Sequence, residues 1–180
     1  MRWEQLFDDL EAQLGAEERR ERDSEVADRT RRERASVALT ARFEASVGST
    51  LRIRLRTGAQ LRGELRDLGE DWLLLRLETG ADAVVPVHAV VGIGDLPARA
   101  SSARTARRFA LGYALRGLSR DRAQVAVTDV GGHVLTGTID AVGADFLDLS
   151  EHALGESRRA ENVTGRQTVP FGALVLVESR

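Results

Sequence analysis

The feature that most limits how this chain can fold is a stretch of sequence that occurs twice. When Gly63 is set opposite Gly137, the segment LRGELRDLGEDWLLL (61–75) aligns with LTGTIDAVGADFLDL (135–149). Apolar residues, glycines and an aspartate coincide along the alignment. Agreement at one offset with matched glycines indicates an internal duplication. The fold should therefore consist of one structural unit used twice.

Each copy has the pattern of short β-strands. Residues 51–55 (LRIRL) and 125–129 (VAVTD) alternate with a period of two, which is typical of half-buried strands. The next segment of each copy carries a central glycine, which marks a bulge or a sharp bend inside a strand. The stretches VVPVHAVVGI (84–93) and TVPFGALVLV (168–177) supply the fourth and fifth strands. Five short and strongly bent strands are what a small β-barrel requires.

Each copy resembles the Sm-like superfamily of small β-barrels, whose bacterial members include an RNA chaperone. The first motif of that family combines an alternating apolar segment, spaced glycines and an aspartate in a turn. In this chain its positions are occupied by Gly58, Leu61, Gly63, Leu65 and Asp71. The segment 87–90 (Val-His-Ala-Val) is similar to a Lys-His-Ala-Ile segment in the second motif of the bacterial members.

The resemblance covers roughly residues 51–96 and 125–178 and implies a fold class. This class is α+β, with two tandem five-stranded Sm-like or SH3-like barrels, each preceded by a helix. Sm-like domains bind RNA and use open sheet edges to form rings. The resemblance therefore implies RNA, or further copies of the chain, as partners. Translation-factor and PRC-type modules share the pattern of glycines and remain alternatives.

The chain departs from the family pattern in the second motif. Pro86 and Val87 replace a Tyr-Lys pair, and Gly172 stands in the second copy where the first has His88. These departures affect the RNA site that the resemblance implies more than the scaffold.

The pattern divides the chain into four segments. They are an N-terminal helical segment (1–46), a first barrel (47–97), a basic helical linker (98–122) and a second barrel (123–180). Residues 16–34 hold acids and arginines in short alternating blocks, with a single large aliphatic side chain. A helix without an apolar stripe stays solvated or is held by ion pairs between its turns. We expect one long charged helix from about Glu17 to Glu44.

The leading functional hypothesis is association with RNA through the linker. Residues 97–122 hold seven arginines and one acid, although the whole chain carries a net charge of −2. Arginine clusters neutralise phosphates without reading sequence. The candidate nucleic-acid-binding residues are Arg104, Arg107, Arg108, Arg116, Arg120 and Arg122, with His88 added through the family resemblance. As alternatives, the arginines pair with acids elsewhere in the chain, which the pI near 6.0 favours, and His88 is structural.

The second hypothesis is a protein–protein assembly module that oligomerises through barrel edges and an N-terminal helix. An apolar stripe with the helical spacing i, i+3, i+4, i+7 and i+11 forms the candidate partner-binding face. Its residues are Trp3, Leu6, Phe7, Leu10 and Leu14. Such a stripe packs either on the chain's own barrel or on a second copy or protein partner, and the sequence leaves both open.

The sequence contains no constellation for catalysis. His88, His133 and His152 lack the spacing of metal ligands, and there is no cysteine. We therefore expect a non-enzymatic protein with no cofactor, no metal and no small-molecule substrate. No apolar run is long enough to cross a membrane. Acids occupy the N-terminus where a signal peptide needs an apolar core, so we expect a cytoplasmic location.

Overall fold

The computed structural model describes most of the chain. The described residues are 22, 24–26, 28–32, 34–101, 109–156 and 158–179. The chain divides into two compact units, Met1–Ala38 and Leu39–Arg180. The described residues of the first unit are helical up to Ala35, and all described strands belong to the second unit. The second unit therefore carries the sites that follow.

The second unit begins with the elements of a first repeat, which we define as residues 39–97. They are α2 (Leu39–Glu44), β1 (Thr50–Leu55), β2 (Gln60–Leu68), β3 (Trp72–Leu77), β4 (Asp82–Pro86), the 3-10 turn η1 (Val87–Ala89) and β5 (Val90–Gly94).

The same order of elements follows in a second repeat, which we define as residues 109–179. They are α3 (Leu111–Arg120), β6 (Gln124–Asp129), β7 (Val134–Val142), β8 (Phe146–Glu151), β9 (Gly165–Pro170), the 3-10 turn η2 (Phe171–Ala173) and β10 (Leu174–Ser179).

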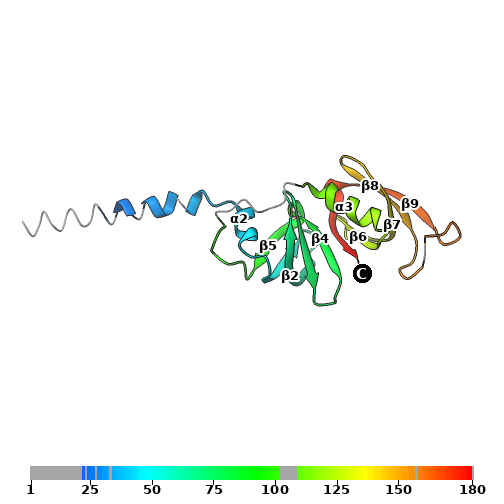
Figure 1. The fold of residues 1–180 in the computed structure, drawn as a ribbon, viewed down its shortest axis with the longest axis horizontal. Coiled ribbons are helices and arrows are strands. Elements are labelled where there is room, and N and C mark those ends of the chain that lie inside the picture. Colours follow the sequence, from blue (N-terminus) through cyan, green and yellow to red (C-terminus); the bar gives the residue numbers. More distant parts are fainter. Residues whose placement is uncertain are drawn as a thin grey trace, which may run out of the picture. The chain divides into compact units, whose positions relative to one another are not determined.

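All ten strands that the structure describes belong to one antiparallel sheet, in the order β5-β1-β2-β3-β4-β10-β6-β7-β8-β9. Figure 1 shows labelled strands of both repeats. The prediction of two separate five-stranded Sm-like or SH3-like barrels with a long charged N-terminal helix is therefore wrong. The physical reason is that the outer strand β4 of the first repeat presents N–H and C=O groups that need partners. Strand β10 of the second repeat pairs with them. The alternating sequence pattern predicts where a strand lies but not which strands pair with it.

The expected single helix from Glu17 to Glu44 is also interrupted. Residues 36–38 are not helical, and α2 begins only at Leu39. Phe43 of α2 is completely buried in the core of the first repeat, whereas the described residues of the charged stretch before the break are exposed, apart from the partly buried Thr30. Because that stretch has no apolar face to bury, tertiary packing fixes only the segment that carries Phe43.

The two central glycines lie where neighbouring strands approach too closely for a side chain. A Cβ at Gly63 in β2 would lie 2.7 Å from the carbonyl oxygen of Arg76 in β3. A Cβ at Gly137 in β7 would collide with the carbonyl oxygen of Ser150 in β8. The ladder also shifts register at a matching position just beyond each glycine. Close approach and bulge together bend β2 and β7, as the sequence pattern predicts.

Two hydrophobic clusters form the core, and each takes side chains from both repeats. The first cluster joins Phe43 and the strands of the first repeat to Val175 and Leu176 of β10. The second joins α3 and the strands of the second repeat to Trp72 and Val84. Burying one large apolar side chain is worth about 1.5–3 kcal/mol. This exchange of side chains therefore joins the two repeats energetically.

Alanine at position 137 tests the close approach of β7 to β8. We expect Gly137→Ala to lower the free energy of unfolding by about 1–3 kcal/mol, because the added methyl group forces the strands apart. The measurement is urea unfolding followed by circular dichroism. Gly172→Ala is the control, since nothing lies within 4 Å of a Cβ at that position. Equal effects of the two substitutions would contradict the interpretation.

Candidate functional site

The two repeats meet along strands β4 and β10. Three residue pairs are in register at this junction: Asp82 with Ser179, Ala83 with Glu178, and Val84 with Val177. The ring nitrogen Nε2 of His88 lies 3.1 Å from the carbonyl oxygen of Leu174 beside the same pairing. The histidine that the family resemblance associates with RNA therefore contacts the other repeat.

The start of helix α3 is held by the first repeat. Ala110 precedes the helix and makes no side-chain capping bond. Instead, Oδ1 of Asp71, in the turn between β2 and β3, accepts a hydrogen bond from the backbone N–H of Leu111 at 2.6 Å. The indole N–H of Trp72 donates to the carbonyl oxygen of Phe109 at 2.9 Å. A carboxylate at this position satisfies an N–H group that the helix leaves unpaired and interacts favourably with the helix dipole.

Removing the carboxylate of Asp71 should weaken the contact between the first repeat and the start of α3. We expect Asp71→Ala to lower the free energy of unfolding by about 1 kcal/mol, the usual effect of losing a helix cap. The matched control is Asp145→Ala. Asp145 occupies the same place in the second repeat, and its exposed side chain makes no hydrogen bond within the described residues. Thermal unfolding of both variants gives the comparison, and a larger loss at Asp145 would refute the capping role.

The sheet ends at β5 on one side and at β9 on the other. Strand β9 is the counterpart of β4, because Pro170 faces Phe146 as Pro86 faces Trp72. Strand β5 is the counterpart of β10, because each follows a 3-10 turn and pairs with the first strand of its repeat. The two edges of the described sheet are thus the counterparts of the two strands that meet at the junction.

An arginine-lined groove of about 780 Å³ lies on the second repeat. Arg120 and Arg122 line it from the end of α3, Arg158 from the loop before β9, and Arg166 from β9 itself. Asp140 of β7 is the single acid in this lining. Such a concentration of guanidinium groups creates a positive potential that attracts anions.

One of these arginines is held in place by the acid. Two nitrogens of Arg158 bond the two carboxylate oxygens of Asp140, with the second contact at 2.9 Å. The hydroxyl of Ser150 donates to the same carboxylate at 2.6 Å. These hydrogen bonds, Arg158 first, and the charge of Arg166 hold the pKa of Asp140 below its usual range, against the opposing effect of burial. Asp140 is therefore an anion, and its carboxylate holds the guanidinium group of Arg158 in position.

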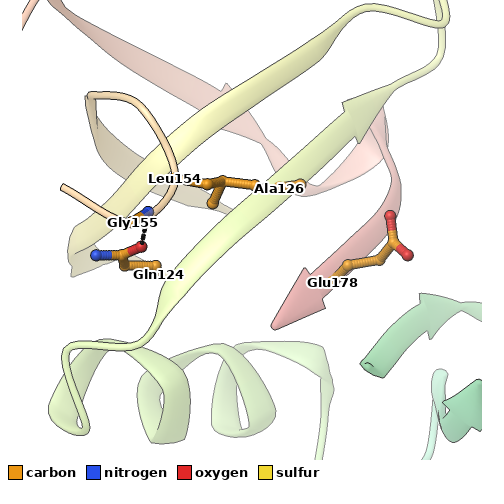
Figure 2. Close-up of a pocket in the computed structure, with 5 residues that line it drawn as sticks. All are labelled: Gln124, Ala126, Leu154, Gly155 and Glu178. Atoms are coloured by element: carbon orange, nitrogen blue, oxygen red, sulfur yellow. Dashed lines mark hydrogen bonds between the residues drawn. The ribbon is translucent and has the colours of Figure 1, made fainter. Parts of the chain in front are cut away.

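A second hollow, of about 480 Å³, shares Gln124 with the groove (Figure 2). Its lining residues are Gln124, Ala126, Leu154, Gly155 and Glu178. The side-chain oxygen of Gln124 accepts from the N–H of Gly155 at 2.7 Å, so Gln124 ties the loop to β6. Figure 2 shows Glu178 on β10, well apart from this bond. The lining places no group beside Glu178 that would activate it as an acid or base.

Of the residues that the sequence predicts to bind nucleic acid, the structure describes His88, Arg116, Arg120 and Arg122. Arg104, Arg107 and Arg108 lie outside the described residues. Arg116 is exposed on α3, while Arg120 and Arg122 line the groove. The partner-binding stripe Trp3, Leu6, Phe7, Leu10 and Leu14 also lies outside the described residues.

Sequence reasoning missed two features of this surface. Arg158 lies in the loop before β9 and Arg166 lies in β9, both outside the basic segment 97–122. The rings of Phe109 and Tyr113 stack with centroids 4.1 Å apart, and both side chains are almost half exposed, at 44% and 45%. Their spacing of four residues at the start of a helix is the sequence signal for such a pair.

Each of the three histidines has a polar contact within the chain. His152 is buried and its Nε2 lies 2.8 Å from Oγ1 of Thr138. His133 lies 3.2 Å from the carboxylate of Asp129. Within the described residues no three potential metal ligands come together. None of the described helices is both long and apolar enough to cross a membrane.

Comparisons with known proteins were made at three levels. No protein-family model, no curated protein and no solved structure matches this chain. The functional argument therefore rests on the geometry of the sheet edges and of the groove.

Proposed function

We propose that this chain is a non-enzymatic assembly module that joins head to tail with further copies of itself through the sheet edges β9 and β5. The observation that carries the proposal is the pairing of β4 with β10 inside the chain. Strand β9 is the counterpart of β4, and β5 is the counterpart of β10. The two edges of the sheet in each chain can therefore pair with the edges of other copies in the way that β4 pairs with β10 inside the chain. Unpaired strand edges are templates for pairing with another chain.

The internal junction also fixes the register of the proposed contact. Transferred onto the counterpart strands, it sets Thr168 opposite Ile93 and Gln167 opposite Gly94 of the next chain. The third pair is Arg166 opposite Asp95. Opposite charges on facing residues of adjacent strands favour pairing. The internal counterpart of this pair, Asp82 with Ser179, has no opposite charges. Asp95 already accepts two hydrogen bonds from Arg52 of its own chain, so Arg166 of the next chain would share its carboxylate with Arg52.

A head-to-tail contact uses two different surfaces of each chain. Such a contact closes into a ring when the rotation from chain to chain allows it, and otherwise continues as a filament. A filament has a mass that rises with protein concentration, and a ring does so only until it closes. Cytoplasmic location and the absence of catalysis remain predictions from the sequence within this proposal.

A proline at position 168 tests the edge without disturbing the sheet behind it. The N–H of Phe171 donates to Asp145, so by alternation along the ladder the N–H of Thr168 points away from β8. We expect Thr168→Pro to leave circular dichroism unchanged and to give the mass of one chain, 19.7 kDa, in size-exclusion chromatography with light scattering. The native chain should be larger at the same concentration.

Thr168→Val is the matched control for that experiment. It removes the hydroxyl that donates to Asp148 but keeps the backbone N–H. The control should assemble as the native chain does. Equal masses for the native chain and the proline variant would rule out the β9 edge as an interface.

Association with RNA remains a second proposal, favoured by the exposed ring pair of Phe109 and Tyr113. Aromatic rings that are free on one side stack with the bases of single strands. Arg116 lies exposed one helical turn from Tyr113 and supplies positive charge beside the rings. This combination supports a contact with single-stranded RNA on the surface of α3 next to the linker arginines.

A further inference from the structure

The arginine-lined groove carries more positive charge than its surroundings balance. Four arginines line it with one aspartate, and that aspartate is bonded to Arg158. Within the described part of the chain, Arg120 and Arg122 form no salt bridge. Exposed arginines of the first repeat behave differently, since several of them pair with an acid. These pairs are Arg52 with Asp95, Arg62 with Glu78, and Arg76 with Asp82.

The backbone at Arg122 is held in a conformation that arginine disfavours. Its φ is 50°, in the left-handed region, directly after Asp121, the C-cap of α3. Helices usually end this way on glycine, because a Cβ costs free energy there. The counterpart of Arg122 in the first repeat is Gly48, four residues beyond the end of α2, with φ of 83°. The second repeat therefore keeps an arginine where the same scaffold accepts glycine, and strain of this kind is found at binding sites.

The remaining arginines of the groove are also absent from the first repeat. The counterpart of Arg166 is Asp82, which has the opposite charge. Arg158 lies in the loop that only the second repeat has, and the counterpart of Arg120 is the buried Ser46. The first repeat folds into the same order of strands without these residues. The order of strands therefore does not depend on these arginines.

We propose that this groove binds a ligand with adjacent phosphate groups, such as a polyphosphate or a nucleoside polyphosphate. The planar guanidinium group of arginine can donate two parallel hydrogen bonds to two oxygens of one phosphate group. Asp140 and Ser150 fix the orientation of Arg158, so one donor is in place before the ligand arrives. Arg120, Arg122 and Arg166 supply three further positive charges, which is more than a single phosphate group balances.

The test is titration of the full chain with inorganic tripolyphosphate in a calorimeter. We expect one site per chain, weakened at least about tenfold in Arg122→Gly and in Arg166→Gln, because a hydrogen bond to a charged group contributes enough for that factor. Arg54→Gln is the control, an exposed arginine of β1 on the first repeat. It should bind as the native chain does. Arg122→Gly should melt at an equal or higher temperature, because glycine relieves the backbone strain.

A second arm identifies the source of the phosphates. A short single-stranded oligonucleotide that displaces tripolyphosphate, and that loses affinity in the same two variants, would identify nucleic acid as the source. An oligonucleotide that leaves tripolyphosphate bound would identify a compact anion. The proposal is overturned if tripolyphosphate does not bind and any oligonucleotide binding is unchanged in the groove variants. It is overturned equally if Arg54→Gln weakens binding as much as they do. The assembly variant Thr168→Pro should still bind, so the two proposals fail separately.

Discussion

The pairing of β4 with β10 is the interaction on which the rest of the second unit depends. It makes one ten-stranded sheet out of two repeats, and it places Trp72 and Val84 in one core and Val175 and Leu176 in the other. The backbone groups of β4 gain hydrogen-bond partners, and apolar side chains beside the β4–β10 pairing are buried in both hydrophobic clusters. The same pairing determines which strands, β5 and β9, are left at the edges.

The two repeats share a scaffold and differ in what they do with it. Both use a central glycine, a bulge and a 3-10 turn at matching positions. At the junction, Trp72 and Asp71 of the first repeat hold the start of α3, while Phe146 and Asp145 of the second are left half-exposed and exposed. The second repeat in turn carries the arginine groove that the first lacks. The two repeats have therefore diverged: the first uses this turn for a contact inside the chain, and the second leaves the matching turn and its arginine groove on the surface.

Local features of this fold could be predicted from the sequence, and long-range ones could not. The alternation of residues 51–55 and 125–129 places them in β1 and β6, and the glycines at 63 and 137 mark real bends. These signals depend only on neighbours along the chain and on adjacent strands. The joining of β4 to β10 depends on residues almost a hundred positions apart, and it overturned the two separate barrels. The groove was missed for the same reason, because Arg158 and Arg166 reach Arg120 and Arg122 only in the folded sheet.

The central claim is that the chain repeats its own internal junction to join other copies, and disulfide trapping tests it most directly. The chain has no cysteine, so Gly94→Cys with Gln167→Cys places one cysteine on each of the two proposed edges. These residues are counterparts of Glu178 and Ala83, which face each other inside the chain. Oxidation should give a ladder of covalently linked chains, because facing residues of adjacent strands lie within disulfide range. A ladder that forms equally well with Val91→Cys in place of Gly94→Cys, or no ladder at all, would contradict the claim.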